Sequence, residues 1–450
     1  MTTKRKEAEM MNFVEPLTDA KLRELQQHFM AWSNHEVVAN AISSNGINQT
    51  AKNAAVLRQL NRTFSDEIKT GKVSNQKQSG RCWLFSILNT LRHKFADQYN
   101  VKDFELSQSY LFFWDKIERA NMFYSHLIAL ADRPLSDRDV TFYLESPDDD
   151  GGQWAMAASL VQKYGVVPRE TFPENAVTEN TSEFAALLNR KLRKDGLALR
   201  KLVRAGANDA EIVAAKDQFL NEVYQITASA IGVPPERFDL EYRDDDNHYH
   251  LDQDVTPKEF YQKYIGVDLN DYVVLSNAPD KNYYQTYALP SQDNVIGGLP
   301  IQFLNLPMEE LKQAAITQLQ NQETVWFGND VLKQADRKAG ILDSQLYLQD
   351  QLLDVDTQMS KKERFESREA EVSHAMTLTG VDLIDGQPRK WKVENSWGDK
   401  VGKDGYFVMG DNWMNDYVYE VVIQRKYLTD KQQAALNSDL IVLPPWDSLA

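Results

Sequence analysis

Apolar residues recur at helical spacing through the first third of the chain. After Cys82, apolar side chains three or four positions apart predict a helix with one face in the core: Leu84, Ile87, Leu88, Leu91 and Phe95. Residues 17–40 predict an earlier helix with the apolar stripe Leu22, Leu25 and Phe29. Residues 107–120, which are rich in aromatic side chains, predict a third helix.

The middle of the chain alternates between turns and helical runs. An acidic, glycine-containing turn over 148–152 precedes a helix that Gly165 is placed to end. Residues 182–230 are rich in Ala, Leu, Lys and Glu and predict helix. Residues 239–254 are acidic and contain two histidines, and they predict a loop. A capping box at 256–259 then starts a short helix.

Strand patterns replace helical spacing in the last third. After one more helix, from Pro307 to about Gln320, runs rich in β-branched and aromatic residues predict five strands: 324–328, 372–384, 390–395, 405–409 and 416–423. The second and third of these strands would form a hairpin. A helix-rich first third and a sheet-rich last third together predict an α+β fold.

Composition and charge narrow the class of protein. The chain has 450 residues, 42% of them apolar, which indicates a globular protein of two or three structural units. A net charge of −16 argues against nucleic-acid binding, because phosphate contacts need a basic surface. A single cysteine cannot form an internal disulfide, which suits a reducing compartment. Without a signal-peptide pattern or a membrane-spanning apolar run, we expect a cytoplasmic protein with no membrane partner.

Cys82 is the candidate nucleophile. A thiol reacts as its thiolate, and the positive end of a helix lowers the thiol pKa, so a cysteine in a first helical turn is well placed for nucleophilic chemistry. Gln76, six positions earlier, would bring an amide to stabilise an oxyanion. The alternative is an inert cysteine buried in the core. The nucleophile interpretation therefore requires a base elsewhere in the chain.

His374 is the candidate base among seven histidines. It begins a predicted buried strand, and Asn395 ends the neighbouring strand, so the amide would reach the imidazole and fix its tautomer. Trp397 would cover this bond, exclude water and border the substrate site. The alternative is a core histidine that bonds a turn asparagine without any catalytic role.

Two other places have candidate binding groups. Gly151 and Gly152 let a backbone approach a ligand closely, so they predict an edge that contacts substrate. His248 and His250 would share one face of a strand and are a conceivable metal site, but so polar a segment is more often solvated. The thiol chemistry needs no metal or other cofactor, and the His-Glu-x-x-His motif of zinc peptidases is absent.

The order glutamine, cysteine, histidine, asparagine resembles that of papain-like cysteine peptidases. Four segments are similar to motifs of that family: 76–86 around the nucleophile, the glycine edge at 151–152, 373–375 and 394–398. The resemblance is closer to the bleomycin hydrolase and bacterial aminopeptidase C branch, because Arg81 directly precedes Cys82. Two further runs look like signatures of this branch: 325–328 and 416–422.

This resemblance implies a papain-like α+β fold, in which a helical half bears the nucleophile and a sheet-rich half bears the base. It divides the chain into five parts: an N-terminal helical extension over 1–70, the helical half over 71–175, a large mainly helical insertion without evident chemistry over 176–305, the sheet-rich half over 306–430, and a C-terminal arm toward the active site over 431–450.

The resemblance also implies a mechanism and a partner class. Cys82 and His374 would rest as thiolate and imidazolium, Cys82 would form a thioester with a peptide substrate, and His374 would then protonate the leaving amine. Asn395 would hold the imidazole, and Gln76 would stabilise the oxyanion. In this branch the C-terminal arm lies in the cleft, so the carboxylate of Ala450 would bind a substrate's α-ammonium and make the enzyme an aminopeptidase. The branch also implies a homohexamer.

Two alternative functions stay open. An endopeptidase of the same fold would result if the C-terminal arm does not block the cleft. A papain-like binding protein without turnover is the other alternative, and the presence of cysteine, histidine and asparagine argues against it.

Overall fold

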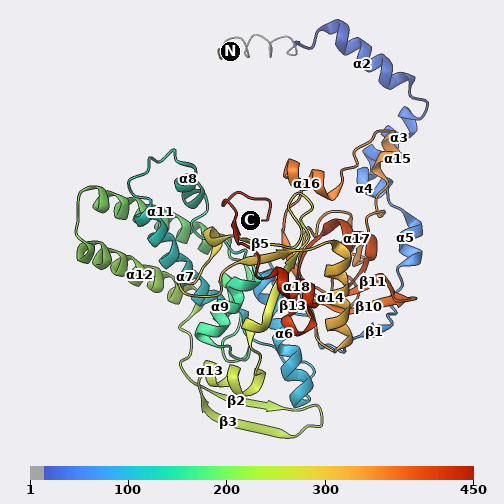
Figure 1. Cartoon of the computed structure of the whole chain (residues 1–450). Helices are drawn as coiled ribbons and strands as arrows, with labels where there is room; N and C mark the ends of the chain where they lie inside the picture. The colour runs from blue at the N-terminus through green and yellow to red at the C-terminus, as the bar shows by residue number, and fades with distance from the viewer. Residues whose placement is uncertain (1–14, 450) are drawn as a thin grey trace. The chain divides into compact units, whose positions relative to one another are not determined.

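The computed structural model describes residues 15–449 (Figure 1). The chain forms two compact units. The smaller unit joins Met1–Ala54 to Gln345–Gln358, and the larger unit joins Ala55–Ser344 to Met359–Ala450. Within residues 15–449, every helix is too short or too polar to span a bilayer.

The smaller unit is helical in its described part. It contains α2 (Asp19–Ala31), α3 (His35–Asn45), α4 (Ile47–Thr50) and α15 (Gln349–Leu353). The single helix predicted over 17–40 is wrong, because α2 ends at Ala31 and a new helix begins at His35. Its apolar stripe is also not buried: Leu22, Leu25 and Phe29 are 48%, 50% and 46% exposed.

A mixed sheet of twelve strands crosses the described part of the larger unit. Its order is β14-β5-β6-β4-β13-β7-β10-β11-β12-β9-β8, and β1 pairs with β10 outside this path. The shortest strands have only two residues: β1 (Asp66–Glu67), β8 (Ala335–Asp336), β9 (Ile341–Leu342) and β14 (Ile441–Val442). The strands of the last third that form the site are β7 (Val325–Asn329), β10 (His374–Ile384), β11 (Gln387–Glu394), β12 (Tyr406–Gly410) and β13 (Val418–Gln424). All five predicted strands are therefore confirmed, and β10 and β11 form the predicted hairpin.

On one face of this sheet, α6 (Cys82–Tyr99) packs on β10 and β7, and α9 (Trp154–Tyr164) packs beside it, with its Trp154 ring against Tyr272 of β4 and Trp326 of β7. α7 (Gln108–Ala129) packs on α6 and α9. The five apolar residues predicted on the buried face of α6 are at most 1% exposed. The other face of the sheet is covered by α14 (Met308–Gln320). Alternation along β7 reflects this arrangement, because Trp326 packs with the α6 side and Phe327 with the α14 side.

The range 176–305, expected to be mainly helical, has mixed structure. α10 (Ala176–Glu179), α11 (Ser182–Arg204) and α12 (Asp209–Ile231) are helical, and α11 and α12 pack beside α7 (Figure 1). The loop predicted over 239–254 is wrong, since β2 (Phe238–Arg243) and β3 (Tyr249–Val255) form a hairpin there. β4 (Tyr272–Ser276), β5 (Gln285–Ala288) and β6 (Gln302–Asn305) join the main sheet. This range therefore contributes to the same core as the segments around it.

Candidate active site

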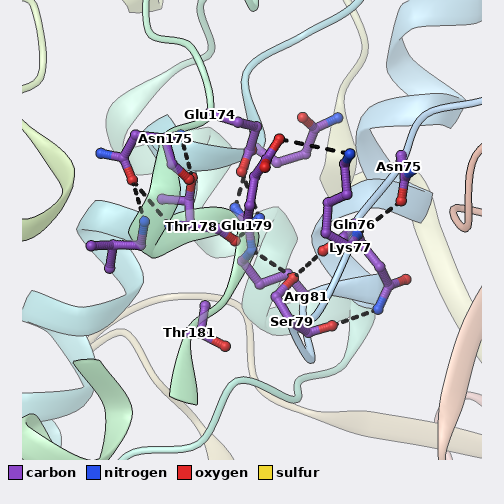
Figure 2. A network of polar contacts seen from close by, with 12 residues as sticks. Asn75, Gln76, Lys77, Ser79, Arg81, Glu174, Asn175, Thr178, Glu179 and Thr181 are labelled. Atoms are coloured by element: carbon purple, nitrogen blue, oxygen red, sulfur yellow. Dashed lines mark hydrogen bonds and ion pairs between the residues drawn. The ribbon is translucent and has the colours of Figure 1, made fainter. Parts of the chain in front are cut away.

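The loop before Cys82 is fixed by a buried ion pair (Figure 2). Arg81 is fully buried, and its guanidinium donates to both carboxylate oxygens of Glu174, at 3.1 and 2.7 Å. It also donates to the Thr178 carbonyl at 2.6 Å and, through Nε, to Ser79 Oγ at 3.0 Å. A buried charge needs such partners, so this network holds the residue before the nucleophile in place. Cys82 therefore begins α6 from a well-fixed loop.

Gln76 is held against the segment that follows β11. Its backbone N–H donates to the Ser396 carbonyl at 2.8 Å, and its Oε1 accepts from Ser396 Oγ at 2.6 Å. Its Nε2 donates to the Ser79 carbonyl at 2.7 Å. An amide nitrogen has two hydrogens, so one remains for another acceptor. These bonds join the loop before Cys82 to the neighbour of Asn395 in sequence.

His374 and Asn395 meet at the start of β10. His374 Nε2 lies 2.9 Å from Asn395 Oδ1. Because an amide oxygen only accepts, Nε2 bears the hydrogen and Nδ1 keeps a lone pair. The Trp397 ring packs on the imidazole, with 4.9 Å between ring centroids, and shields the bond. The neutral imidazole therefore has its basic nitrogen on the side away from Asn395.

Cys82 and His374 border the same cleft, which has a volume of about 500 Å³. Ser86, one turn after Cys82, donates to the Met376 carbonyl at 2.7 Å and so ties α6 to β10. The backbone N–H of Ala375, the residue after His374, interacts with the Cys82 thiol. The helix with the thiol and the strand with the imidazole thus meet in one wall of the cleft.

Burial shifts the pKa values of both the Cys82 thiol and the His374 imidazole. It raises the pKa of the Cys82 thiol to about 11, although backbone N–H groups, that of Ala375 first, oppose the shift. Burial also lowers the pKa of His374 to about 4; the bond to Asn395 opposes this change and the Arg337 guanidinium adds to it. A lone thiolate and a lone imidazolium are therefore both disfavoured. These shifts favour a neutral thiol and a neutral imidazole over the thiolate–imidazolium pair expected from the resemblance, and they leave the imidazole available as a base.

Gly151 and Gly152 also border the cleft. A Cβ at Gly152 would lie 2.7 Å from the Trp83 ring, so only glycine lets this backbone pack against the residue after the nucleophile. The acidic turn before these glycines is tied into the core. Asp148 is 3% exposed and accepts from Lys116 Nζ at 3.0 Å. An ion pair therefore helps to fix this wall of the cleft.

The described end of the chain lies beside the cleft. Ala450 is outside the described residues. Leu449 is fully buried, and its carbonyl accepts from Nε2 of Gln153, which borders the cleft, at 3.3 Å. Further upstream, Asp447 pairs with Lys281 at 2.9 Å. The last part of the C-terminal arm is therefore fixed next to the cleft.

The histidine pair considered as a metal site is engaged by an aspartate. Asp244 Oδ2 lies 3.2 Å from His248 Nδ1 and 2.9 Å from His250 Nε2. Among residues 15–449, no three His, Cys, Asp or Glu side chains are arranged to hold a metal ion. These two histidines belong to the β2–β3 hairpin and do not border the cleft described above.

Several cleft residues were missed by the sequence analysis. Gln292 and Asp293 border the cleft, although their range was expected to have no chemistry. His126, which had been given no role, stacks on Tyr143 at 4.3 Å and also borders the cleft. Glu420 of β13 also borders the cleft; it lies in the signature run 416–422 but had been given no role. Strand pairing and helix packing bring these positions to the cleft, and no local sequence pattern showed that they would border it.

Comparisons with known proteins give relatives over almost the whole chain. The model of the Peptidase C1-like family matches residues 16–450. Aminopeptidase G of Lactobacillus delbrueckii subsp. lactis and Aminopeptidase E of Lactobacillus helveticus are each 54% identical to this chain, and each alignment covers 96% of this chain and 99% of the relative. The crystal structure of PepW from Lactobacillus rhamnosis HN001 superposes with a TM-score of 0.94 at 47% identity, covering 96% of this chain and 98% of that one.

Proposed function

Since the chain belongs to the Peptidase C1-like family, we propose that it is a cysteine aminopeptidase that removes N-terminal residues from peptides through a thioester. The family resemblance and the papain-like α+β fold expected from the motifs are confirmed. The observation that supports the proposal most is the 2.9 Å contact between His374 and Asn395 beside the cleft that Cys82 borders. The similarity to Aminopeptidases G and E supports peptides with a free N-terminus as substrates.

The first half of the reaction forms the thioester. His374 Nδ1 takes the thiol proton as Cys82 Sγ attacks the carbonyl carbon of the scissile bond. The backbone N–H of Cys82 and the remaining amide hydrogen of Gln76 stabilise the oxyanion, and one such donor is typically worth about 2.7–4 kcal/mol. The imidazolium, which Asn395 orients, then gives its proton to the leaving amine.

The second half of the reaction releases the acid. His374 takes a proton from water as the water oxygen attacks the thioester carbonyl. When the tetrahedral intermediate collapses, the C–S bond breaks and the proton returns to Cys82 Sγ. Trp397 shields the bond between the imidazole and Asn395 from solvent during both halves. The thiol and the neutral imidazole are thereby restored.

The acid limb of the pH profile is expected to lie below the usual histidine value. His374 accepts a proton only when it is neutral, so activity is lost as the pH falls through its pKa. Burial lowers that pKa from 6.5 to about 4, so kcat/KM should persist well below pH 6.5. The measurement is kcat/KM against pH with a substrate that does not titrate in this range.

Arg337 offers a control for this profile. Burial is the larger cause of the lowered His374 pKa, and the positive charge of Arg337 lowers it further. Arg337→Ala should therefore move the acid limb to higher pH. Arg337 lies over the Trp397 ring, 4.1 Å from its centroid, and is exposed to solvent. A wild-type acid limb at or above pH 6.5 would contradict the role given to His374.

We attribute the preference for N-terminal residues to the C-terminal arm over 431–450. Leu449 bonds to Gln153 at the cleft. From the resemblance, we propose that the carboxylate of Ala450 binds close to the N-terminus of a bound substrate. A carboxylate forms a charge-assisted hydrogen bond with the α-ammonium of a free N-terminus. The arm itself would exclude peptides that extend further in this direction.

Removal of Leu449 and Ala450 is therefore expected to add cleavage at internal bonds. The wild-type and shortened chains receive one peptide library, half of it with acetylated N-termini, and mass spectrometry identifies the products. The wild type should release N-terminal residues from free peptides, and the shortened chain should also cleave acetylated peptides. The matched control is Leu449→Ala, which keeps the length and the terminal carboxylate.

The same library separates the alternative functions. Internal cleavage of acetylated peptides by the wild type would favour the endopeptidase. No cleavage of any peptide, together with measurable peptide binding, would favour a binding protein without turnover. If the wild type and the shortened chain give identical products, the C-terminal arm has no role in specificity.

We further infer from the resemblance that the chain assembles as a homohexamer in the cytoplasm. A single cysteine is compatible with a reducing compartment. The five-part division proposed above needs one change, because strands of the range 176–305 belong to the main sheet. We therefore treat only its helices and the β2–β3 hairpin as added to the papain-like halves.

A further inference from the structure

Gly151 and Gly152 form an edge of the cleft whose direction needs support from other residues. Glycine has no Cβ, so its backbone torsions are less restricted than those of other residues. Within residues 15–449, the N–H and the carbonyl of Gly152 have no backbone hydrogen-bond partner. Both groups can therefore pair with an extended peptide, as the edge of a sheet does, provided that they are held in the right direction.

The turn before this edge is anchored to α7 and to the loop before the nucleophile. Lys116 of α7 donates from Nζ to the Asp149 carbonyl at 2.7 Å. Asp150 accepts from the backbone N–H of Gly80 at 3.3 Å, and its carbonyl accepts from Trp83 Nε1 at 2.7 Å. The turn is therefore bonded to residues on both sides of the nucleophile. These bonds end at residue 150, one residue before the glycines.

Arg119 of α7 is the side chain that reaches the carbonyl of Gly151. Its Nη2 donates to this carbonyl, and its Nε donates to Asp115 Oδ2 at 2.7 Å. Asp115 is fully buried, and its other carboxylate oxygen accepts from Asn294 Nδ2 at 2.8 Å. The guanidinium also lies over the Trp83 ring, 5.6 Å from its centroid. A buried carboxylate and a buried ring therefore fix the direction of the guanidinium.

The peptide bond passes this direction on to the next residue. The carbonyl of Gly151 and the N–H of Gly152 belong to one planar trans unit, so they point in opposite directions. A guanidinium bonded to the carbonyl therefore sets the direction of the N–H. Arginine suits this task because its planar fork binds Asp115 and the Gly151 carbonyl in a fixed relative geometry. A lysine ammonium on its flexible stem imposes no such geometry.

We propose that Arg119 is a positioning residue that orients the peptide unit between Gly151 and Gly152, so that the Gly152 N–H faces a backbone carbonyl of the bound peptide. Arg119 acts through the protein's own backbone and requires no contact with the substrate. The inference rests on the proposed peptide substrates and adds how their backbone is held. Because the partner group is a backbone carbonyl, this contribution to binding is independent of the substrate's side chains.

The test is peptide binding, measured by calorimetry in a Cys82→Ala background that prevents turnover. One peptide is compared with a series of analogues in which a neutral trans-alkene replaces one peptide bond at a time and so removes one backbone carbonyl. In the parent chain, the analogue without the carbonyl that meets Gly152 should bind about 3- to 10-fold more weakly, the loss expected for one hydrogen bond.

Two substitutions of Arg119 separate orientation from charge. Arg119→Lys keeps the positive charge and removes the fork, and Arg119→Met removes both. Each should weaken binding of the unmodified peptide by about 3- to 10-fold. Each should bind that one analogue no more weakly than the unmodified peptide, because the hydrogen bond is already lost. A residue that only supports the fold would not produce this dependence on a single substrate carbonyl.

The matched control is Arg204→Lys. The Nε and Nη2 of Arg204 donate to the carbonyls of Ala131 and Arg133 at 2.6 and 2.7 Å, so this substitution also breaks a fork on backbone carbonyls. Arg204 does not border the cleft. Arg204→Lys should therefore keep both the affinity of the parent chain and its response to the alkene series. Thermal unfolding of each variant shows whether its fold is retained.

Three results would overturn the proposal. The first is a parent chain that binds no peptide or binds every analogue as tightly as the unmodified peptide. The second is parental affinity in Arg119→Lys. The third is a loss in Arg119→Lys that is the same factor for every analogue, which would mean that Arg119 only supports the fold. Because this assay needs no turnover, a wild type that cleaves no peptide would refute the proposed function and leave the binding result valid.

Discussion

Alanine in place of Cys82 is expected to lower kcat/KM for peptides by roughly 10⁴- to 10⁶-fold, the loss seen when a peptidase nucleophile is removed. The reason is that no second thiol exists in the chain to replace it. The substitution removes one sulfur atom from a residue that is 8% exposed at the cleft, so the fold should persist. The measurement is steady-state cleavage of a free peptide, with circular dichroism to confirm folding.

Alkylation of the thiol gives an independent control for this result. An alkylating reagent should add once per chain, because Cys82 is the only cysteine. The reaction should slow in His374→Ala, since burial raises the thiol pKa to about 11 and only a nearby base can then take the proton. Wild-type turnover by Cys82→Ala, or alkylation that is independent of His374, would contradict the thioester mechanism.

The parts of the site that lie close together in sequence were predictable. The helix from Cys82 has an uninterrupted apolar face, and that periodicity is a local property of the chain. The approach of His374 to Asn395 follows from a hairpin whose two strands are only a few residues apart. In both cases the pattern within about 25 residues is enough to specify the local structure.

The other parts depend on pairing between distant segments. Glu420 faces the cleft because β13 pairs with β7 in one register, and a shift of one residue would turn it to the opposite face. The β2–β3 hairpin was taken for a loop because its residues are mostly polar and acidic. β2 does alternate, with Phe238, Leu240 and Tyr242 on its less exposed face, but β3 is polar and exposed over most of its length. Gln292 and Asp293 reach the cleft through the tertiary fold of a range without a motif.

Arg81 shows how a residue of the sequence motif acts through structure rather than chemistry. Its guanidinium does not border the cleft but forms the centre of the network in Figure 2, with Glu174, Thr178 and Ser79 around it. Ser79 also accepts from the amide of Gln76 through its carbonyl. The loop that presents both the nucleophile and the oxyanion donor therefore depends on one buried ion pair.

Glu174→Gln is consequently expected to lower the free energy of unfolding by about 3–5 kcal/mol, the usual cost of leaving a buried charge without its partner. Arg81 is 0% exposed, so water cannot replace the lost carboxylate. Denaturant unfolding of both chains near neutral pH measures the difference. The Gln76 amide would also lose its fixed position, so kcat should fall with little change in KM.

The pH dependence of this loss tests whether the ion pair itself is responsible. Burial opposes ionisation of Glu174, but Arg81 outweighs it and holds the pKa of Glu174 below its usual value. The ion pair therefore stabilises the wild type fully at pH values above the usual glutamate pKa of about 4.3. This stabilisation is lost as the pH falls through the lower pKa that Glu174 has in the folded protein. The wild type and Glu174→Gln should therefore have the same stability at such acidic pH.

The matched control is Glu366→Gln, which breaks an exposed ion pair with Lys362 and should lower the free energy of unfolding by less than about 1 kcal/mol. An equal loss of stability in Glu174→Gln and Glu366→Gln would contradict the argument.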